Sequence, residues 1–100
     1  MSSEIYTIDQ LKTMLIPVFQ LHGVKRAVLF GSYGKGSAGM NSDIDLLVDS
    51  RLRGLRFVGL MEDVRRTVNK DVDLLDVSHV EVNSEIDDEI KKTGVLLYEE

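Results

Sequence analysis

The sequence contains no cysteine and no tryptophan, and only one of its 100 residues is proline. Without cysteine there is neither a disulfide framework nor a thiolate zinc site. This fits a reducing compartment, so we expect a cytoplasmic protein. No apolar run approaches the roughly 20 residues of a membrane-spanning helix, and residues 1–4 lack the basic and apolar regions of a signal peptide. We therefore expect neither a membrane protein nor a secreted disulfide scaffold.

A basic excess is missing as well, because 12 lysines and arginines stand against 17 aspartates and glutamates, for a net charge of −5. A general nucleic-acid binder usually shows a basic excess or stripe, so we expect no direct contact with nucleic acid. One stretch does gather basic side chains. It is either a solvated face, which we favour, or a flank that meets an acidic partner or a nucleotide's phosphates: Arg51, Arg53, Arg56, Arg65, Arg66 and Lys70.

The composition that remains is ordinary for a globular protein, with 43% hydrophobic and 29% charged residues. The length suits one domain over residues 1–100. Periodicity predicts helices over residues 7–22, 55–69 and 84–94, and strands over residues 24–30, 43–49, 72–77 and 95–98. The resulting order, α-β-β-α-β-α-β, predicts an α+β (mixed α/β) fold: a small mixed β-sheet with helices packed on it.

Several details of these elements can be tested against a structure. Thr7 is a candidate N-cap of the first helix, and Pro17 inside that helix predicts a kink or a break. In the helix over residues 55–69, the side chains expected to face the core are Val58, Met61, Val64 and Val68. Asp71 and Asp76, near the ends of the third strand, are interpreted as solvated strand ends.

The loop after the first predicted strand reads Gly31-Ser32-Tyr33-Gly34-Lys35-Gly36-Ser37. Gly31 and Gly34 permit positive φ and close backbone approach, and successive N–H groups in such a turn can bind an anion. The hydroxyl of Ser32 adds a donor. A Gly-Ser turn alone is weak evidence, and the spacing of a Walker A loop is absent.

The acidic residues that follow carry more information. Asp43 and Asp45 stand two residues apart in a strand pattern, so their side chains share one face. Asp73 lies inside a later apolar strand, where aspartate is depleted and costly to bury unless it is paired or metal-bound. Three carboxylates suit two Mg²⁺ ions, with phosphate oxygens and waters completing the coordination. The pattern therefore predicts a metal-dependent site that handles phosphoryl groups.

These residues resemble the nucleotidyltransferase superfamily with the polymerase-β-like core. The stretch from Leu29-Phe30-Gly31-Ser32-Tyr33 to Ser42-Asp43-Ile44-Asp45-Leu46-Leu47-Val48 closely resembles the minimal nucleotidyltransferase (MNT) family. Members are small prokaryotic proteins often encoded beside a HEPN-domain protein, with which they form a toxin–antitoxin pair. The resemblance covers about residues 5–98, and its motif matches over eighteen positions, with Asp73 matched less firmly.

The resemblance implies a function. Asp43, Asp45 and Asp73 would be the catalytic residues and would ligate two Mg²⁺ ions, with Asp73 also activating the attacking hydroxyl. Gly31 and Ser32 would hold the triphosphate. The reaction would transfer a nucleoside monophosphate, AMP from ATP, to a tyrosine of the HEPN ribonuclease toxin. This adenylylation (AMPylation) would make the protein an antitoxin in a hetero-oligomer with that toxin.

Two further residues are assigned to the nucleotide site. The family commonly has Ala-Arg-Gly after the aromatic residue, whereas this sequence has Gly34-Lys35-Gly36. Lys35 keeps the charge for a phosphate contact but loses the bidentate geometry of arginine. Ser42 either orients Asp43 or a metal-bound water, or it only caps the turn, which we favour slightly.

Two other functions remain open at this stage. The fold could serve as a steric antitoxin, a binding module that blocks its toxin without catalysis. It could also be a stand-alone transferase acting on a small molecule or an RNA end. Because 100 residues leave little room for the helical substrate-binding domain of larger relatives, we expect a partner protein to present the acceptor.

Overall fold

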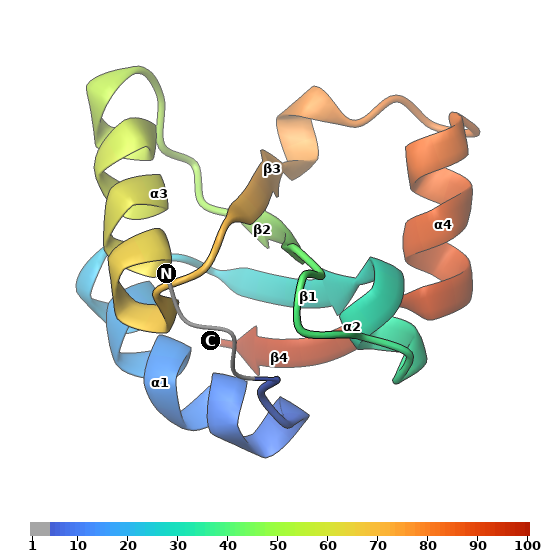
Figure 1. Cartoon of the computed structure of the whole chain (residues 1–100). Helices are drawn as coiled ribbons and strands as arrows, with labels where there is room; N and C mark the ends of the chain where they lie inside the picture. The colour runs from blue at the N-terminus through green and yellow to red at the C-terminus, as the bar shows by residue number, and fades with distance from the viewer. Residues whose placement is uncertain (1–4) are drawn as a thin grey trace.

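The computed structural model describes residues 5–100, so the expectation about residues 1–4 lies outside the described residues. Figure 1 shows the elements in chain order. They are α1 (Ile8–Leu21), β1 (Arg26–Phe30), α2 (Gly31–Lys35), β2 (Ile44–Asp49), α3 (Leu55–Val68), β3 (Val72–Asp76), the short 3-10 helix η1 (Val77–His79), α4 (Glu85–Thr93) and β4 (Val95–Glu99). The predicted α+β class is confirmed, and α2 is a short helix at the Gly-Ser turn.

The four strands form one sheet in the order β3-β2-β1-β4. Strand β1 is antiparallel to both β2 and β4, whereas β2 and β3 are parallel. A parallel pair needs a crossover connection, and α3 is that connection. Because parallel strands start at the same end of the sheet, the first residues of β2 and β3 lie side by side.

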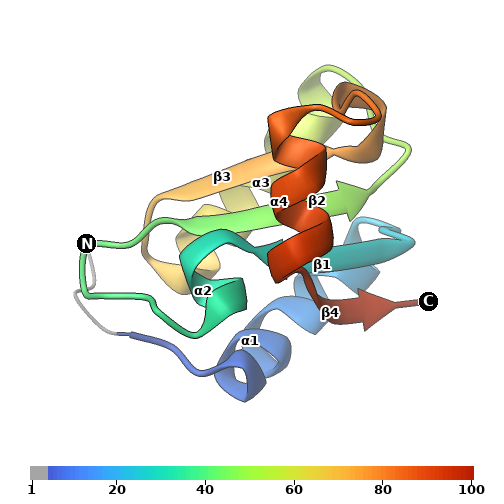
Figure 2. The same ribbon diagram turned by 90° about the vertical axis from the view of Figure 1, so that its right-hand side faces the viewer.

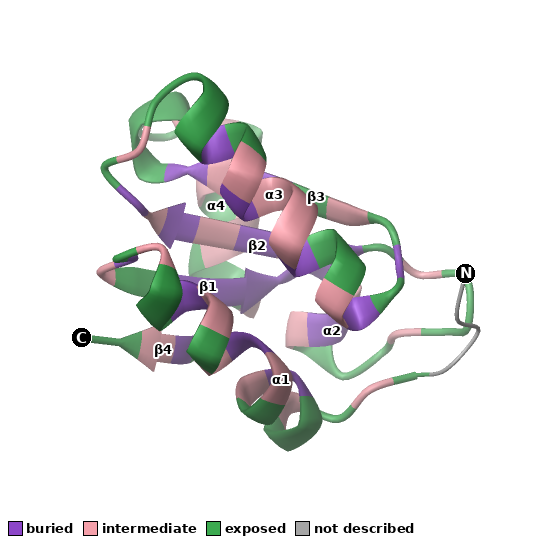
Figure 3. Cartoon of the chain, turned by 90° about the vertical axis from the view of Figure 1, so that its left-hand side faces the viewer, coloured by how far each residue is buried: buried purple, intermediate pink, exposed green. Residues whose placement is uncertain are grey.

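The two faces of the sheet are covered differently. Helices α1 and α3 cover one face (Figure 3), and residues of these helices and of the strands form the buried core. Figure 2 shows α4 and α2 in front of the opposite face. Strand β2 alternates between the two, with Ile44, Leu46 and Val48 buried in the core and the residues between them half-buried on the α4 side. The acidic positions of β2 therefore lie on the face opposite the core.

Helix α1 confirms the predicted cap. The N–H of Gln10 donates to the Thr7 hydroxyl oxygen at 3.0 Å, and the N–H of Thr7 donates to Gln10 Oε1 at 2.8 Å, forming a capping box. The helix continues through Pro17, so the predicted break does not occur. Pro17 and Thr13, whose carbonyl loses its helical partner, are both exposed, so water can satisfy that carbonyl.

The core-facing stripe of helix α3 shares Val64 and Val68 with the predicted one. Met61 is partly buried and packs against the core, as predicted, whereas Val58 is 47% exposed, so that assignment was wrong. The buried side chains are Phe57, Leu60, Val64 and Val68. Phe57 and Leu60, which the prediction left out, also fit helical spacing with Val64. The ring of Phe57 also packs edge-on against His79, at a centroid distance of 5.6 Å.

The interpretation of Asp76 as a solvated strand end is wrong. Its side chain is buried and accepts four hydrogen bonds, from the backbone N–H and the hydroxyl of Ser50 and from those of Ser78, at 2.6–3.0 Å. Burial alone would raise the pKa of Asp76, but these bonds outweigh it and lower the pKa to about 2. Asp76 therefore links the end of β2 to the end of β3.

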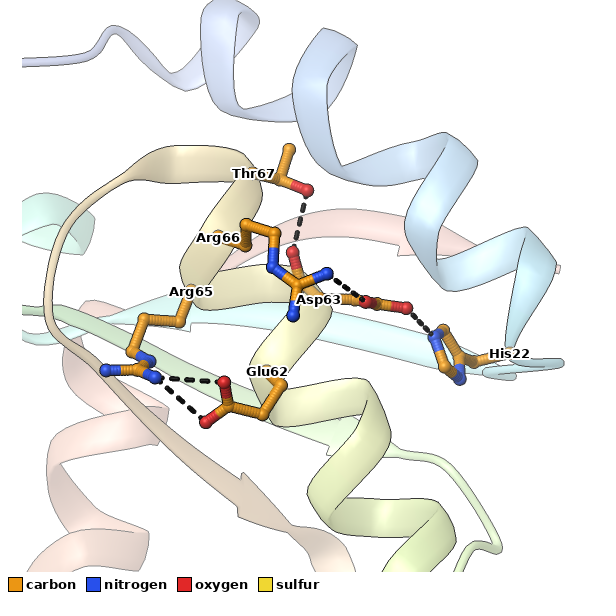
Figure 4. Close-up of polar contacts among 6 residues, drawn as sticks. All are labelled: His22, Glu62, Asp63, Arg65, Arg66 and Thr67. Carbon is orange, nitrogen blue, oxygen red and sulfur yellow. Dashed lines mark hydrogen bonds and ion pairs between the residues drawn. The ribbon is translucent and has the colours of Figure 1, made fainter.

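A second polar link joins α1 to α3 (Figure 4). His22 Nε2, at the end of α1, lies 2.6 Å from Asp63 Oδ2, and the Asp63 backbone carbonyl accepts a 2.7 Å hydrogen bond from the Thr67 hydroxyl. Arg66 and Arg65 pair with Asp63 and Glu62 at 3.8 and 2.9 Å. Arg65 and Arg66, two residues of the basic stretch, thus pair with acids of their own helix, as expected if that stretch is a solvated face.

Among residues 5–100, no helix combines the length and apolar character needed to cross a membrane.

Candidate active site

The centre of the candidate site is the pair Asp45 and Asp73. Asp45 is the second residue of β2 and Asp73 the second residue of β3, and the parallel register places them directly opposite each other. Paired residues of neighbouring strands point to the same face. The two carboxylates therefore meet on the α4 side of the sheet.

Gly31 lies against the Asp45 side chain of this pair. It begins α2 with φ +69°, and an ideal Cβ on it would stand 2.2 Å from Asp45 Oδ2. Any side chain here would have both a strained backbone and a clash with the carboxylate. A glycine at this position lets the Gly-Ser helix approach Asp45 closely.

The electrostatic environment of Asp45 is unfavourable to a bare charge. Its pKa is raised to about 6, first by burial, then by the negative charge of Asp73 and a hydrogen bond between the two carboxyl groups. The charges of Glu89 and Asp43 raise it further. Folding therefore places three other acidic groups within electrostatic reach of Asp45, and a bound cation would reverse the repulsion.

Beside the pair is an open pocket of about 410 Å³ between the sheet and α4. Asp45, Asp73 and Glu89 supply its carboxylates. The rest of its lining is apolar and consists of Phe30, Met61, Val72, Leu74, Leu75 and Ile86. A volume of 300–1,000 Å³ with an apolar wall and a few polar groups is typical of small-molecule and side-chain sites.

Asp43 lies just outside β2 and is exposed. The loop before it is held from two sides. The N–H of Gly39 donates to the Ser42 hydroxyl at 2.9 Å, and the buried Lys70 ammonium donates to the Met40 carbonyl at 3.1 Å. Ser42 thus takes the turn role, and Lys70 anchors the loop rather than joining an exposed basic face.

Ser32 and Lys35 lie on α2. Ser32, the second residue of the helix, is half-buried, whereas Lys35 at its end is exposed. Lys35 lines a second pocket of about 340 Å³ with residues of α4, including Glu89 and Lys92. Since Glu89 lines both pockets, the pocket at α2 and the pocket at the aspartate pair border the same part of α4.

The donor set suits a hard divalent cation, because Mg²⁺ prefers carboxylate oxygens. Asp45 and Asp73 are the two that face each other, with the charge of Asp43 acting on Asp45 from nearby. Within residues 5–100, no three or more His, Asp or Glu side chains already lie close enough to enclose a metal ion. The aspartate pair would therefore be its starting point, with further oxygens coming from substrate and water.

Sequence reasoning missed Glu89 and Thr93. Both lie on α4, on the helical stripe formed by Ile86, Glu89, Ile90 and Thr93. The signal available was an acid and a hydroxyl on the same stripe as two isoleucines, at helical spacing. Nothing local indicated that this stripe would face Asp45 and Gly31.

The sequence model of the family "Polymerase beta, Nucleotidyltransferase" matches residues 13–100. The chain belongs to this family. It is a nucleotidyltransferase, and its residues from the middle of α1 to the carboxyl end form the family's domain.

Individual proteins resemble this nucleotidyltransferase as well. A Methanocaldococcus jannaschii protein named as a protein adenylyltransferase is 39% identical over 70 residues, which cover 68% of this chain and 75% of that protein. A toxin–antitoxin crystal structure with AMP-PNP superposes with a TM-score of 0.75 at 24% identity, over 89% of this chain and 73% of the other.

Another solved structure contains a tri-AMPylated Shewanella oneidensis HEPN toxin in complex with an MNT antitoxin. It superposes with a TM-score of 0.70 at 19% identity, over 94% of this chain and 74% of the other. At this level of identity, the two structures show a shared fold.

Proposed function

We propose that this nucleotidyltransferase transfers AMP from ATP to a tyrosine hydroxyl of a HEPN-domain partner and thereby acts as its antitoxin. The observation that carries the proposal is the Asp45–Asp73 pair, which lines an open pocket, with Gly31 packed against the Asp45 carboxylate. The similarity to a protein named as an adenylyltransferase, and to antitoxins solved with AMP-PNP and with an AMPylated toxin, supports this choice of reaction and partner.

Each residue of the candidate site would have a distinct role. Gly31, Ser32 and Lys35 would bind the triphosphate at α2. Asp43, Asp45 and Asp73 would hold Mg²⁺, which would neutralise negative charge on the phosphates when bound. The side chain of Ser42 would act indirectly, by closing the turn before Asp43.

The chemical step is an in-line displacement at the α-phosphorus. The acceptor oxygen forms a bond to that phosphorus while the bond to the bridging oxygen breaks, and pyrophosphate leaves. The hydroxyl proton passes to the carboxylate of Asp73, which lies at the pocket edge of the sheet. Positioning of the two reactants supplies much of the rate enhancement in such reactions.

The wall of the 410 Å³ pocket supports an aromatic acceptor. Phe30, Leu75 and Ile86 offer an apolar surface beside the carboxylates, which suits a side chain with an apolar ring and a polar tip. A tyrosine fits this description because its ring can contact the wall while its hydroxyl reaches the acidic end.

The test uses the purified chain with Mg²⁺ and α-labelled ATP, with and without the product of the neighbouring gene, which the proposal expects to be a HEPN-domain protein. We expect label on the partner, abolished by the Asp43→Asn/Asp45→Asn double variant and retained by Asp49→Asn. Asp49 is a matched control because it lies on the same face of β2 as Asp45, at the far end of the strand.

Each outcome has a distinct meaning. Label on the partner with the wild-type protein and with Asp49→Asn, but not with Asp43→Asn/Asp45→Asn, establishes the reaction and the role of the acids. A tight complex without label from ATP or the other three nucleotides would refute the transfer and favour a steric antitoxin. Label on a small molecule or RNA end in the absence of the partner would instead identify a stand-alone transferase.

A further inference from the structure

A hydrogen bond joins the carboxyl end of α4 to the Gly-Ser helix, and the residue that makes it is Thr93. Figure 2 shows α4 crossing in front of the sheet and ending next to α2. The N–H of Gly31 donates to Thr93 Oγ1 at 3.0 Å, and the same hydroxyl donates to the Glu89 carbonyl at 2.8 Å. Thr93 thus links Glu89, which lines the acidic pocket, to Gly31, which packs against Asp45.

The backbone of Thr93 also contacts α2. An ideal Cβ on Gly34 would stand 2.2 Å from the Thr93 carbonyl oxygen, so the two backbones touch. Gly34 lies one turn after Gly31 on α2. Thr93 therefore contacts the short helix at both of its glycines, once through the side chain and once through the main chain.

The hydrogen bond to Gly31 has a consequence for the site. Gly31 is buried, and its N–H is the first of α2, where no helical carbonyl can accept it. Its Cα stands over Asp45 with no space for a methyl group. The acceptor on Thr93 therefore fixes how α2 sits relative to the Asp45 carboxylate.

A threonine hydroxyl bonded within its own helix is a common and unremarkable arrangement. Thr67 of α3 shows it, since its hydroxyl donates to the Asp63 carbonyl four residues earlier at 2.7 Å (Figure 4). Thr93 makes the same bond to Glu89, but its oxygen also accepts from Gly31, 62 residues away in sequence. The second bond is what distinguishes Thr93.

We propose that Thr93 is a positioning residue for the nucleotide: its hydroxyl holds the Gly-Ser helix in place above Asp45, and its removal weakens nucleotide binding. The inference rests on the proposed function, because it assigns the nucleotide to α2. It adds that the placement of α2 depends on α4, an element outside the Gly-Ser and aspartate motifs.

The variants are Thr93→Val, which removes the hydroxyl at nearly constant size, and Thr93→Ser, which keeps it. Thr67→Val is the matched control, because it deletes the intrahelical bond alone. ATP affinity with Mg²⁺ is measured by calorimetric titration. We expect a loss of about tenfold for Thr93→Val, the size expected for one hydrogen bond to a buried donor, with the other two variants within about twofold of wild type.

A second readout is independent of nucleotide. The amide of Gly31 should exchange its hydrogen faster in Thr93→Val than in wild type, Thr93→Ser or Thr67→Val, as measured by NMR without ATP. Unchanged ATP affinity in Thr93→Val would overturn the inference, as would an equal loss in Thr93→Ser or Thr67→Val.

Wild-type protein that binds no ATP would refute the proposed function, and with it the role of Thr93 in nucleotide binding. The exchange of the Gly31 amide would still report whether Thr93 holds α2 in place. Failure of the inference alone has a different signature, namely a wild-type protein that binds ATP together with a Thr93→Val variant that binds it equally well.

Discussion

The close approach of Gly31 to the Asp45 side chain makes a quantitative prediction for Gly31→Ala. The new methyl group would stand 2.2 Å from Asp45 Oδ2 and 3.2 Å from its Cγ. Ordinary contact needs about 3.5 Å, so the carboxylate has to move by about 1 Å or more. A displacement of that size at a reacting centre can reduce the rate about a hundredfold.

Gly36→Ala is the matched control for backbone strain. Gly36 caps the other end of α2 with φ +77°, and nothing lies within 4 Å of a Cβ built on it. Both alanines take on the cost of a left-handed conformation, about 1–2 kcal/mol. Only Gly31→Ala adds crowding, for about 1–3 kcal/mol more.

The assay combines urea unfolding with transfer of label from α-labelled ATP to the partner. We expect Gly36→Ala to lose stability while retaining most of its activity, and Gly31→Ala to lose activity about a hundredfold as well. Equal activity of the two variants would refute the reasoning, since it would mean that the position of the Asp45 carboxylate under Gly31 is unimportant for transfer.

Three further predictions concern charged groups. The pKa of Asp45 is raised from 3.8 to about 6 in the folded state, so the folded protein binds its proton more tightly than the unfolded chain does. In EDTA, the free energy of unfolding should therefore fall by about 1 kcal/mol, after solvent screening, between pH 4 and 6. Asp45→Asn should abolish this fall, and a fall that persists in Asp45→Asn would contradict the prediction. Because the pKa of Asp76 is lowered to about 2, Asp76→Asn should lower the free energy of unfolding by about 1–2 kcal/mol at neutral pH and by progressively less as pH falls from about 4 to 2. A loss of stability that does not depend on pH would argue against the role of the Asp76 charge. Lys70→Met should change the unfolding free energy by only about 1 kcal/mol, because the lost hydrogen bond opposes the relieved burial of a charge. It should nevertheless speed amide exchange over residues 39–43 and slow transfer; unchanged exchange would show that Lys70 does not anchor this loop.

The meeting of Asp45 with Asp73 was accessible to sequence reasoning because it depends on strand rules. Alternation placed Asp43 and Asp45 on one face, and an aspartate inside a later apolar strand indicated a shared site. The structure brings Asp45 and Asp73 into register on parallel strands, while Asp43 remains at the exposed entrance to β2. Their roles as metal ligands and catalytic groups stay predictions.

Glu89, Thr93 and Asp76 could not be predicted in the same way, because their roles depend on contacts between distant segments. Asp76 accepts a hydrogen bond from Ser50, 26 residues away in sequence, and Thr93 accepts one from Gly31, 62 residues away. The error at Val58 of α3 has a different cause: Val58 and its neighbour Phe57 both fit the helical spacing of the core-facing stripe. Packing against the sheet decides between them, and the sequence pattern does not contain that information.

The two faces of the sheet separate stability from chemistry. Helices α1 and α3 each place three or more buried residues against one face, whereas no residue of α4 on the other face is buried, and Ile86 remains 39% exposed. An incompletely covered face keeps water near the acidic groups, and water screens the repulsion between Asp45 and Asp73 that a sealed core would amplify. The loose packing of α4 is therefore part of how the fold tolerates its carboxylates without a bound cation. It also means that substitutions on the α4 side should reduce activity more than stability, whereas those beneath α1 and α3 should do the reverse.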